Sequence, residues 1–160
     1  MEVGTPMGLR PGHTSSIRRI EAAMMSYHAD MTIENNPFEL GLDRLVNLEI
    51  EADFVGKEAL AKIKAEGVRQ KLVGLEIAGA PLAGSNDAFW PVQGDDGKVG
   101  YVTSAIYSPR LQKNIALAML GIDHTVPGTR LGVNRLGEIR DAEVVPIPFY
   151  DPKKALAVAG

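Results

Sequence analysis

The sequence predicts an α+β protein in which short helical segments are followed by an antiparallel β-barrel or sandwich. Before residue 71, two stretches carry apolar residues at three- and four-residue spacing, which is typical of amphipathic helices. After residue 71, short β-prone runs alternate with turns rich in Gly, Pro, Asn and Asp. The chain has 160 residues, 45% of them apolar, so it is long enough to bury one compact core.

The first expected helix runs from about residue 14 to Tyr27. One of Thr14, Ser15 or Ser16 can cap its amino end, and its apolar positions are Ile17, Ile20, Met24 and Met25. Glycines and prolines punctuate residues 1–13 and leave room for at most a short strand over residues 8–10.

The segment between the two helices reads as loop and strand. Residues 30–37 (DMTIENNP) hold Asp, Asn and Pro and predict a loop. In residues 46–51, Val, Leu and Ile alternate with Asn and Glu, which predicts a half-buried strand. Residues 55–66 (VGKEALAKIKAE) are strong helix formers, and Gly67 stands where the helix should stop.

The β-prone runs of the second part cover residues 71–77, 99–107, 115–120, 129–133 and 139–145. Hairpin turns are expected at residues 95–97 (DDG) and 134–137 (NRLG). We therefore divide the chain into residues 1–70 with two helices, a barrel over residues 71–150, and a tail over residues 151–160.

Composition excludes several classes of function. The 17 basic and 20 acidic residues are interspersed and give a net charge of -3, so no nucleic-acid footprint is expected. The absence of cysteine excludes disulfides and thiolate chemistry. No segment approaches the ~20 apolar residues of a membrane span, and the three histidines have no metal-ligand spacing. We expect a cytoplasmic protein without a metal site.

Glu21 is the most informative polar residue. It lies on the first expected helix, close to the apolar stripe that contains Ile17 and Met24. A carboxylate that faces a core or cleft needs a partner. That partner is either Arg18 or another arginine in a salt bridge, or a ligand with several N–H donors.

Three segments occur in a fixed order along the chain. They read RRIEAAMMSYHADMTIENNPFELGLDRLV, DFVGKEAL and VGYVTSAIYSPRLQKNIALAML. In this order they resemble the hallmark segments of the glycine-cleavage T-protein (aminomethyltransferase) family. The motif TSAIYSPR is most similar to the branch that contains dimethylsulfoniopropionate demethylase.

The resemblance implies a Greek-key or jelly-roll-like carboxy-terminal barrel, preceded in residues 1–70 by a remnant of a folate-binding domain. It implies tetrahydrofolate as cofactor, with Glu21 bonded to the pterin ring and Tyr27 stacked on or bordering the folate. Arg69 would pair with the glutamyl tail, and Tyr107 would lie near the cofactor channel. The family often has glycine at the positions of Ala23 and His28. The bulk of these side chains either narrows the folate cleft or only marks variation within the family.

The resemblance also implies an activity, the transfer of a one-carbon unit from a small-molecule donor to N5 of tetrahydrofolate. Complete family members carry about twice this much chain and place their catalytic group in the amino-terminal part. We therefore expect a chain that binds folate but is inactive alone, with no assigned catalytic residue and no identified donor. The alternative is a non-catalytic folate-binding or protein-interaction module. In the family the first helix would pack against the amino-terminal part, so here its apolar stripe should be exposed unless a second copy covers it, which predicts a homo-oligomer.

Overall fold

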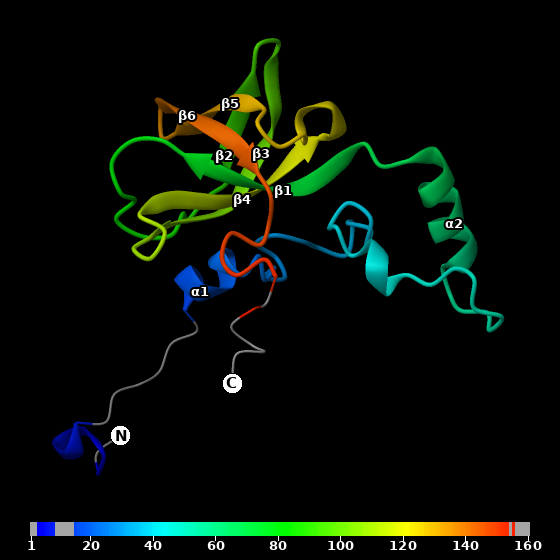
Figure 1. Cartoon of the computed structure of the whole chain (residues 1–160), viewed down its shortest axis with the longest axis horizontal. Coiled ribbons are helices and arrows are strands. Elements are labelled where there is room, and N and C mark those ends of the chain that lie inside the picture. The colour runs from blue at the N-terminus through cyan, green and yellow to red at the C-terminus, as the bar shows by residue number, and fades with distance from the viewer. Residues whose placement is uncertain (1–2, 9–14, 154, 156–160) are drawn as a thin grey trace.

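A computed structural model describes residues 3–8, 15–153 and 155 of the chain. Its centre is a closed antiparallel barrel, which confirms the predicted fold class (Figure 1). The strands are β1 (Gln70–Ile77), β2 (Trp90–Gly94), β3 (Gly97–Ser108), β4 (Lys113–Gly121), β5 (Arg130–Arg135) and β6 (Glu138–Val145). Three short 3-10 turns accompany them: η1 (Thr5–Met7), η2 (Asp43–Leu45) and η3 (Ile122–His124).

The strand order around the barrel is β1-β4-β3-β2-β5-β6, and β6 closes against β1. Strands β2, β3 and β4 follow one another as hairpins, while β1 lies beside β4 instead of β2. This is the Greek-key arrangement. Closure pairs both sides of every strand, so the barrel presents no open edge to other chains.

Strand β4 is buried from Asn114 to Leu120 because both of its faces are covered. Ala116, Ala118 and Leu120 belong to the core inside the barrel. The alternate residues Ile115, Leu117 and Met119 belong to a second cluster outside it. A strand covered on both sides reads as a continuous apolar run, as KNIALAML does.

Helix α1 (Ser16–Glu21) covers the outer face of β3 and β4. The side chain of Ser15 accepts a hydrogen bond from the Arg18 amide, so one of the three expected caps is used. Ile20 is 0% exposed and packs in the outer cluster. Ile17 and Met25 are partly buried against the same cluster, whereas Met24 is 63% exposed. The prediction that the apolar stripe would be exposed is therefore wrong for three of its four residues, which the barrel covers.

The helix ends at Glu21, six residues before the predicted end at Tyr27. The amide of Ala23 bonds to the Ile20 carbonyl, and that of Met24 bonds to the Arg19 carbonyl. These two bonds, with Ala23 at a φ of 53°, form a Schellman motif. Glycine usually occupies the left-handed position of this motif, so an alanine there gave no signal of a helix end.

Residues 46–51 form no strand, and that prediction is wrong. The Asn47 side chain accepts a hydrogen bond from the Glu49 amide, which bends the chain in a local turn. Ile50 is 47% exposed and faces no partner strand. A segment with alternating apolar and polar residues forms a strand only where a second strand can pair with that segment.

Helix α2 (Lys57–Glu66) confirms the predicted helix to within two residues, and Gly67 ends it as expected. The helix buries none of its residues and stands to one side of the barrel (Figure 1). Together with η2 and the intervening loop it forms a projecting arm, residues 43–66. No helix among the described residues is long and apolar enough to cross a membrane.

Strand β2 was not predicted, because Pro91 lies within it and the run before the turn is short. Both predicted hairpin turns are confirmed: Gly94 pairs with Gly97, and Arg135 pairs with Glu138. The expected short strand over residues 8–10 and most of the expected tail over residues 151–160 lie outside the described residues. The first barrel strand begins at Gln70, and the division of the chain near residue 71 stays a prediction.

Candidate functional site

Glu21, the last residue of α1, holds its carboxylate between the helix and the barrel, where the residue is 3% exposed. The Ser108 hydroxyl, at the end of β3, donates a 2.5 Å hydrogen bond to Glu21 Oε1. Arg110 Nη1, in the β3–β4 turn, lies 3.8 Å from Glu21 Oε2, and the Arg110 side chain is 50% exposed. The arginine partner of Glu21 is therefore Arg110, and not Arg18, its neighbour on the helix.

The segment after β6 crosses the end of α1 and completes this enclosure. The Tyr150 amide donates a 3.0 Å hydrogen bond to the Glu21 carbonyl. The Arg110 guanidinium lies 4.2 Å from the centre of the Tyr150 ring, a cation–π contact. Arg110 and Tyr150 thus form the outer wall beside the Glu21 carboxylate.

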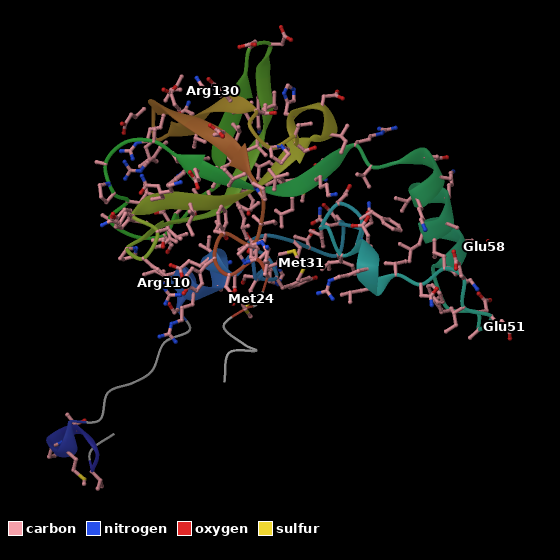
Figure 2. All side chains as sticks on the ribbon, in the orientation of Figure 1. Met24, Met31, Glu51, Glu58, Arg110 and Arg130 are labelled. Atoms are coloured by element: carbon pink, nitrogen blue, oxygen red, sulfur yellow. The ribbon has the colours of Figure 1, made fainter. Side chains whose placement is uncertain are left out.

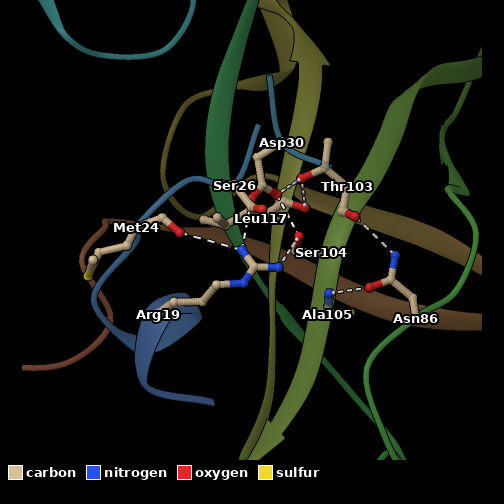
Figure 3. A network of polar contacts seen from close by, with 9 residues as sticks. All are labelled: Arg19, Met24, Ser26, Asp30, Asn86, Thr103, Ser104, Ala105 and Leu117. Atoms are coloured by element: carbon tan, nitrogen blue, oxygen red, sulfur yellow. Dashed lines mark hydrogen bonds and ion pairs between the residues drawn. The ribbon is translucent and has the colours of Figure 1, made fainter. Parts of the chain in front are cut away.

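A second buried carboxylate belongs to Asp30, in the loop that follows α1, and this residue is 2% exposed (Figure 3). Its Oδ2 accepts hydrogen bonds from Arg19 Nη1 and from the Ser26 amide, both at 2.8 Å. Its Oδ1 accepts the hydroxyls of Thr103 and Ser104, both at 2.6 Å. Four donors from α1, its following loop and β3 therefore satisfy one charge.

The sequence predicts only a loop at Asp30, and this network does not follow from it. A signal existed in VTSAIYS, where Ser104, Ile106 and Ser108 share one strand face at a spacing of two. In the structure, Ser104 meets Asp30 and Ser108 meets Glu21 on the outer face of β3. These contacts fix residues 22–30 against the barrel.

The loop held in this way carries Tyr27 and His28, whose ring centroids are 4.4 Å apart. Tyr27 is 53% exposed and borders a cleft of about 480 Å³, which we call the Tyr27 cleft. Its lining consists of Tyr27, His28, Ala29, Asn86, Asp87, Ala88, Phe89 and Thr103. Aromatic rings half open to solvent give it a surface suited to a flat, partly apolar ligand.

Tyr107 lies elsewhere. It packs against the core inside the barrel, whereas its neighbour Ser108 points outward to Glu21. Tyr107 borders a cavity of about 650 Å³ at the end of the barrel where β1 and β3 end and β4 begins, here called the barrel-mouth cavity. Arg69 is exposed at the other end of β4, where its carbonyl accepts the Ile122 amide.

The four residues predicted to contact folate therefore do not form one site. Glu21 and Tyr27 flank the same helix-and-loop segment, while Tyr107 and Arg69 are separated from them by the barrel wall and by the length of β4. Ala23 and His28, where the resemblance places glycine, have positive φ values of 53° and 71°. Their departure from glycine therefore affects the backbone first, because left-handed residues are favourable mainly for glycine. Among the described residues, no group of three His, Cys, Asp or Glu side chains could hold a metal ion.

Comparison with known proteins identifies residues 70–151 as a match to the Glycine cleavage T-protein C-terminal barrel domain. The chain is similar to the aminomethyltransferase of Synechococcus sp. (strain CC9311), with 42% identity over 91% of this chain and 38% of that protein. It is 39% identical to the aminomethyltransferase of Symbiobacterium thermophilum over 94% of this chain and 40% of the relative. The chain thus spans about two fifths of the length of these curated relatives.

A solved structure shares the fold. The aminomethyltransferase T of the glycine cleavage system from Bartonella henselae superposes with a TM-score of 0.75 at 23% sequence identity. The superposition covers 85% of this chain and 38% of that one. The outer helix and loop, as well as the barrel, therefore lie within the span of the relatives.

Proposed function

Because the chain belongs to the glycine cleavage T-protein family, through the barrel domain matched by residues 70–151, we propose that it is the carboxy-terminal portion of a tetrahydrofolate-dependent one-carbon transferase. One observation carries most weight: relatives named aminomethyltransferase match 91% or more of this chain at about 40% identity, including the segment with Glu21 and Tyr27. We further propose that residues 1–70 belong to the folate-binding domain of such an enzyme.

The Glu21 carboxylate could accept the hydrogen bonds that a pterin donates, and this match can be tested. A pterin presents its 2-amino group and ring N–H as donors, and a carboxylate can accept both. Glu21 Oε1 accepts the Ser108 hydroxyl, whereas Oε2 has, among the described residues, a single polar contact, the 3.8 Å ion pair with the half-exposed Arg110. Movement of the Arg110 side chain toward solvent would free this oxygen as an acceptor.

Tyr27 is the second proposed folate contact. It is exposed, it borders an aromatic-lined cleft, and the Asp30 network holds the loop that carries it. Tyr107 and Arg69 stand apart from this surface, and their roles as folate contacts stay predictions from the resemblance. The proposed site is thus one wall of a folate cleft, supplied by α1 and the loop after it.

Tetrahydrofolate supplies the N5 atom that accepts the one-carbon unit. In this proposal the role of the chain is to hold and orient the pterin through the Glu21 carboxylate, which Ser108 keeps in position on the barrel. Among the described residues we assign no general acid, base or nucleophile. We therefore propose that the chain binds folate but does not turn over alone, and that the remaining part of a longer enzyme supplies the donor pocket.

The identity of the one-carbon donor is a narrower question within this proposal. The motif TSAIYSPR favours the branch of dimethylsulfoniopropionate demethylase, whereas the relatives reported above are named aminomethyltransferase. Activity assays with an aminomethyl-lipoyl carrier protein and with dimethylsulfoniopropionate, in a full-length enzyme that contains this chain, distinguish the two donors. A cytoplasmic location also stays a prediction.

Calorimetric titration of the purified chain with tetrahydrofolate tests the folate role. We expect saturable binding that Glu21→Gln weakens about tenfold or more, since a charge-assisted hydrogen bond contributes ~1.5–3 kcal/mol. Glu58→Gln is the matched control, because it removes an exposed carboxylate of helix α2 away from the proposed site and should leave binding unchanged. No binding by the wild-type chain, or equal losses in both variants, would count against a pterin contact at Glu21.

The alternative is a non-catalytic folate-binding or protein-interaction module. A measurement of enzymatic turnover distinguishes it from the proposed transferase. Mixing the chain with the separately expressed amino-terminal portion of a relative should restore one-carbon transfer under the proposed function. A folded mixture that binds tetrahydrofolate and transfers nothing from either donor would favour the module.

A further inference from the structure

The Tyr27 cleft has a second wall, which comes from the loop between β1 and β2. Residues 86–89 of that loop line the cleft together with the loop after α1. The Phe89 ring is 53% exposed, the same fraction as Tyr27. Two segments that are far apart in the sequence thus each contribute one half-exposed aromatic ring to the cleft.

Both loops are anchored to the same short stretch of strand β3 (Figure 3). The Asn86 side chain accepts the Ala105 amide at 2.6 Å and donates to the Thr103 carbonyl at 3.1 Å. From the loop after α1, Asp30 accepts the hydroxyls of Thr103 and Ser104. Because both anchors lie on neighbouring residues of one strand, the two walls are held in position before a ligand binds. Such a preorganised site loses little free energy to ordering on binding.

A β-bulge makes this double anchoring possible. The register between β3 and β4 shifts between Val102 and Ser104, which leaves Thr103 as the extra residue. Successive residues of a regular strand point to opposite faces, but here the hydroxyls of Thr103 and Ser104 both reach Asp30 Oδ1. Bulges are common beside functional sites, where they redirect side chains.

Each exposed ring is also in contact with a neighbouring ring of the chain. The ring centroids of Phe89 and Tyr101 are 5.1 Å apart, and those of Tyr27 and His28 are 4.4 Å apart. These contacts restrict both exposed rings, so a ligand that stacks on them costs less side-chain entropy.

We propose that Tyr27 and Phe89 hold the aminobenzoyl ring of tetrahydrofolate between them. This inference rests on the proposed folate role, in which the pterin lies at Glu21. The described residues that line the cleft include the carboxylate of Asp87 but no lysine or arginine. The anionic glutamyl tail is therefore disfavoured in the cleft, and the neutral aminobenzoyl ring is the part of folate that suits it.

The spacing of the two anchor points on β3 agrees with this arrangement. Ser108 holds Glu21, and Thr103 lines the cleft. They are five positions apart on the strand, which corresponds to roughly 15 Å. The pterin and aminobenzoyl rings, joined by a short bridge, extend over a comparable length.

Calorimetry with two ligands tests the proposal. They are tetrahydrofolate and 6-methyltetrahydropterin, which has the pterin but lacks the aminobenzoyl ring. Phe89→Ala should weaken tetrahydrofolate binding about tenfold, because it removes one stacking partner and its apolar surface. It should leave the affinity for 6-methyltetrahydropterin unchanged. Phe89→Tyr keeps the ring and should keep the wild-type affinity for both ligands.

Phe54→Ala is the matched control, because it removes another partly exposed ring, 38% exposed, from the projecting arm. Phe54 lies between Glu51 and Glu58 in the sequence, and Figure 2 shows these two residues on the arm, away from Met24 and Met31 on either side of the Tyr27 loop. This variant should leave the affinity for both ligands unchanged.

Glu21→Gln separates this inference from the proposed folate role, because it should weaken both ligands. Where it does so, tetrahydrofolate affinity that Phe89→Ala leaves unchanged, or equal losses of both ligands in Phe89→Ala, would overturn this inference alone. A wild-type chain that binds neither ligand would overturn the proposed folate role and this inference with it.

Discussion

Asp30 illustrates, at the scale of single residues, how this chain buries charge. Its carboxylate accepts four hydrogen bonds, and the Arg19 guanidinium balances its charge at 2.8 Å. A buried carboxylate that lost these donors would bear the full cost of desolvation. The network joins α1, the loop that carries Tyr27, and β3, so the position of the proposed folate wall depends on it.

Asp30→Asn should therefore lower the free energy of unfolding by on the order of 3 kcal/mol, because it removes one charge of a buried pair and leaves Arg19 uncompensated. Urea denaturation followed by circular dichroism measures the change. The exposed Asp43→Asn is the matched control and should stay within about 0.5 kcal/mol of the wild type. A similar small change in both variants would contradict a structural role for the network.

Ala23→Gly tests the Schellman motif. Ala23 has a φ of 53°, where an L-residue other than glycine is strained, so glycine should raise the free energy of unfolding by about 0.5–1 kcal/mol. Its neighbour Ala22 has a φ of -86°, and Ala22→Gly should instead destabilise the protein. Changes of the same sign in both variants would show that the backbone conformation does not control the effect.

The need of Glu21 for a partner could be predicted from the sequence, because a carboxylate near an apolar helix stripe must be paired. The identity of the partner could not. Ser108 is 87 positions away along the chain, and only the closed barrel brings it beside α1. The partners of Asp30 could not be predicted for the same reason, since Thr103 and Ser104 are 73 and 74 positions away along the chain.

At the scale of elements, local sequence patterns predict correctly those helices and strands that depend on local interactions. Helix α2 begins and ends close to its predicted limits because helix formers and Gly67 define it. The predicted strand over residues 46–51 was wrong because strands also require a partner. Strand β2 contains Pro91 and was missed, yet pairing with β3 and β5 forms it.

Gly100→Ala tests the close packing of β3 on β4. A Cβ at Gly100 would clash with the backbone carbonyl oxygen of Met119, which cannot move without breaking the strand pair. We expect destabilisation of about 1–3 kcal/mol or more, measured as a lower urea midpoint. Gly84→Ala is the control, because nothing lies within 4 Å of its added Cβ and it should be near neutral.

At the scale of the whole molecule, the class of fold followed from the sequence, but the strand order did not. Short strands with regular turns indicated an antiparallel barrel. The neighbourhood of β1 and β4 depends on contacts between residues 70–77 and 114–121, which no local pattern specifies. The helix that was expected to need a second copy is covered by the barrel instead.

Self-association remains a prediction, and the structure moves its expected location to the projecting arm. Leu45, Phe54 and Val55 are 64%, 38% and 103% exposed there. We expect light scattering to show a mass that rises with concentration, and the double variant Phe54→Asp and Val55→Asp to remain a monomer. A wild-type chain that is monomeric at every concentration would contradict this.

In the proposed folate enzyme, this carboxy-terminal part holds the pterin through α1 and the loop after it. Amide chemical-shift mapping of the labelled chain with tetrahydrofolate tests it most directly. We expect shifts concentrated at Glu21, Tyr27, Ser108 and Arg110, and their loss in Glu21→Gln. Shifts confined to the barrel-mouth residues Tyr107, Asn114 and Leu131, or no shifts at all, would contradict it.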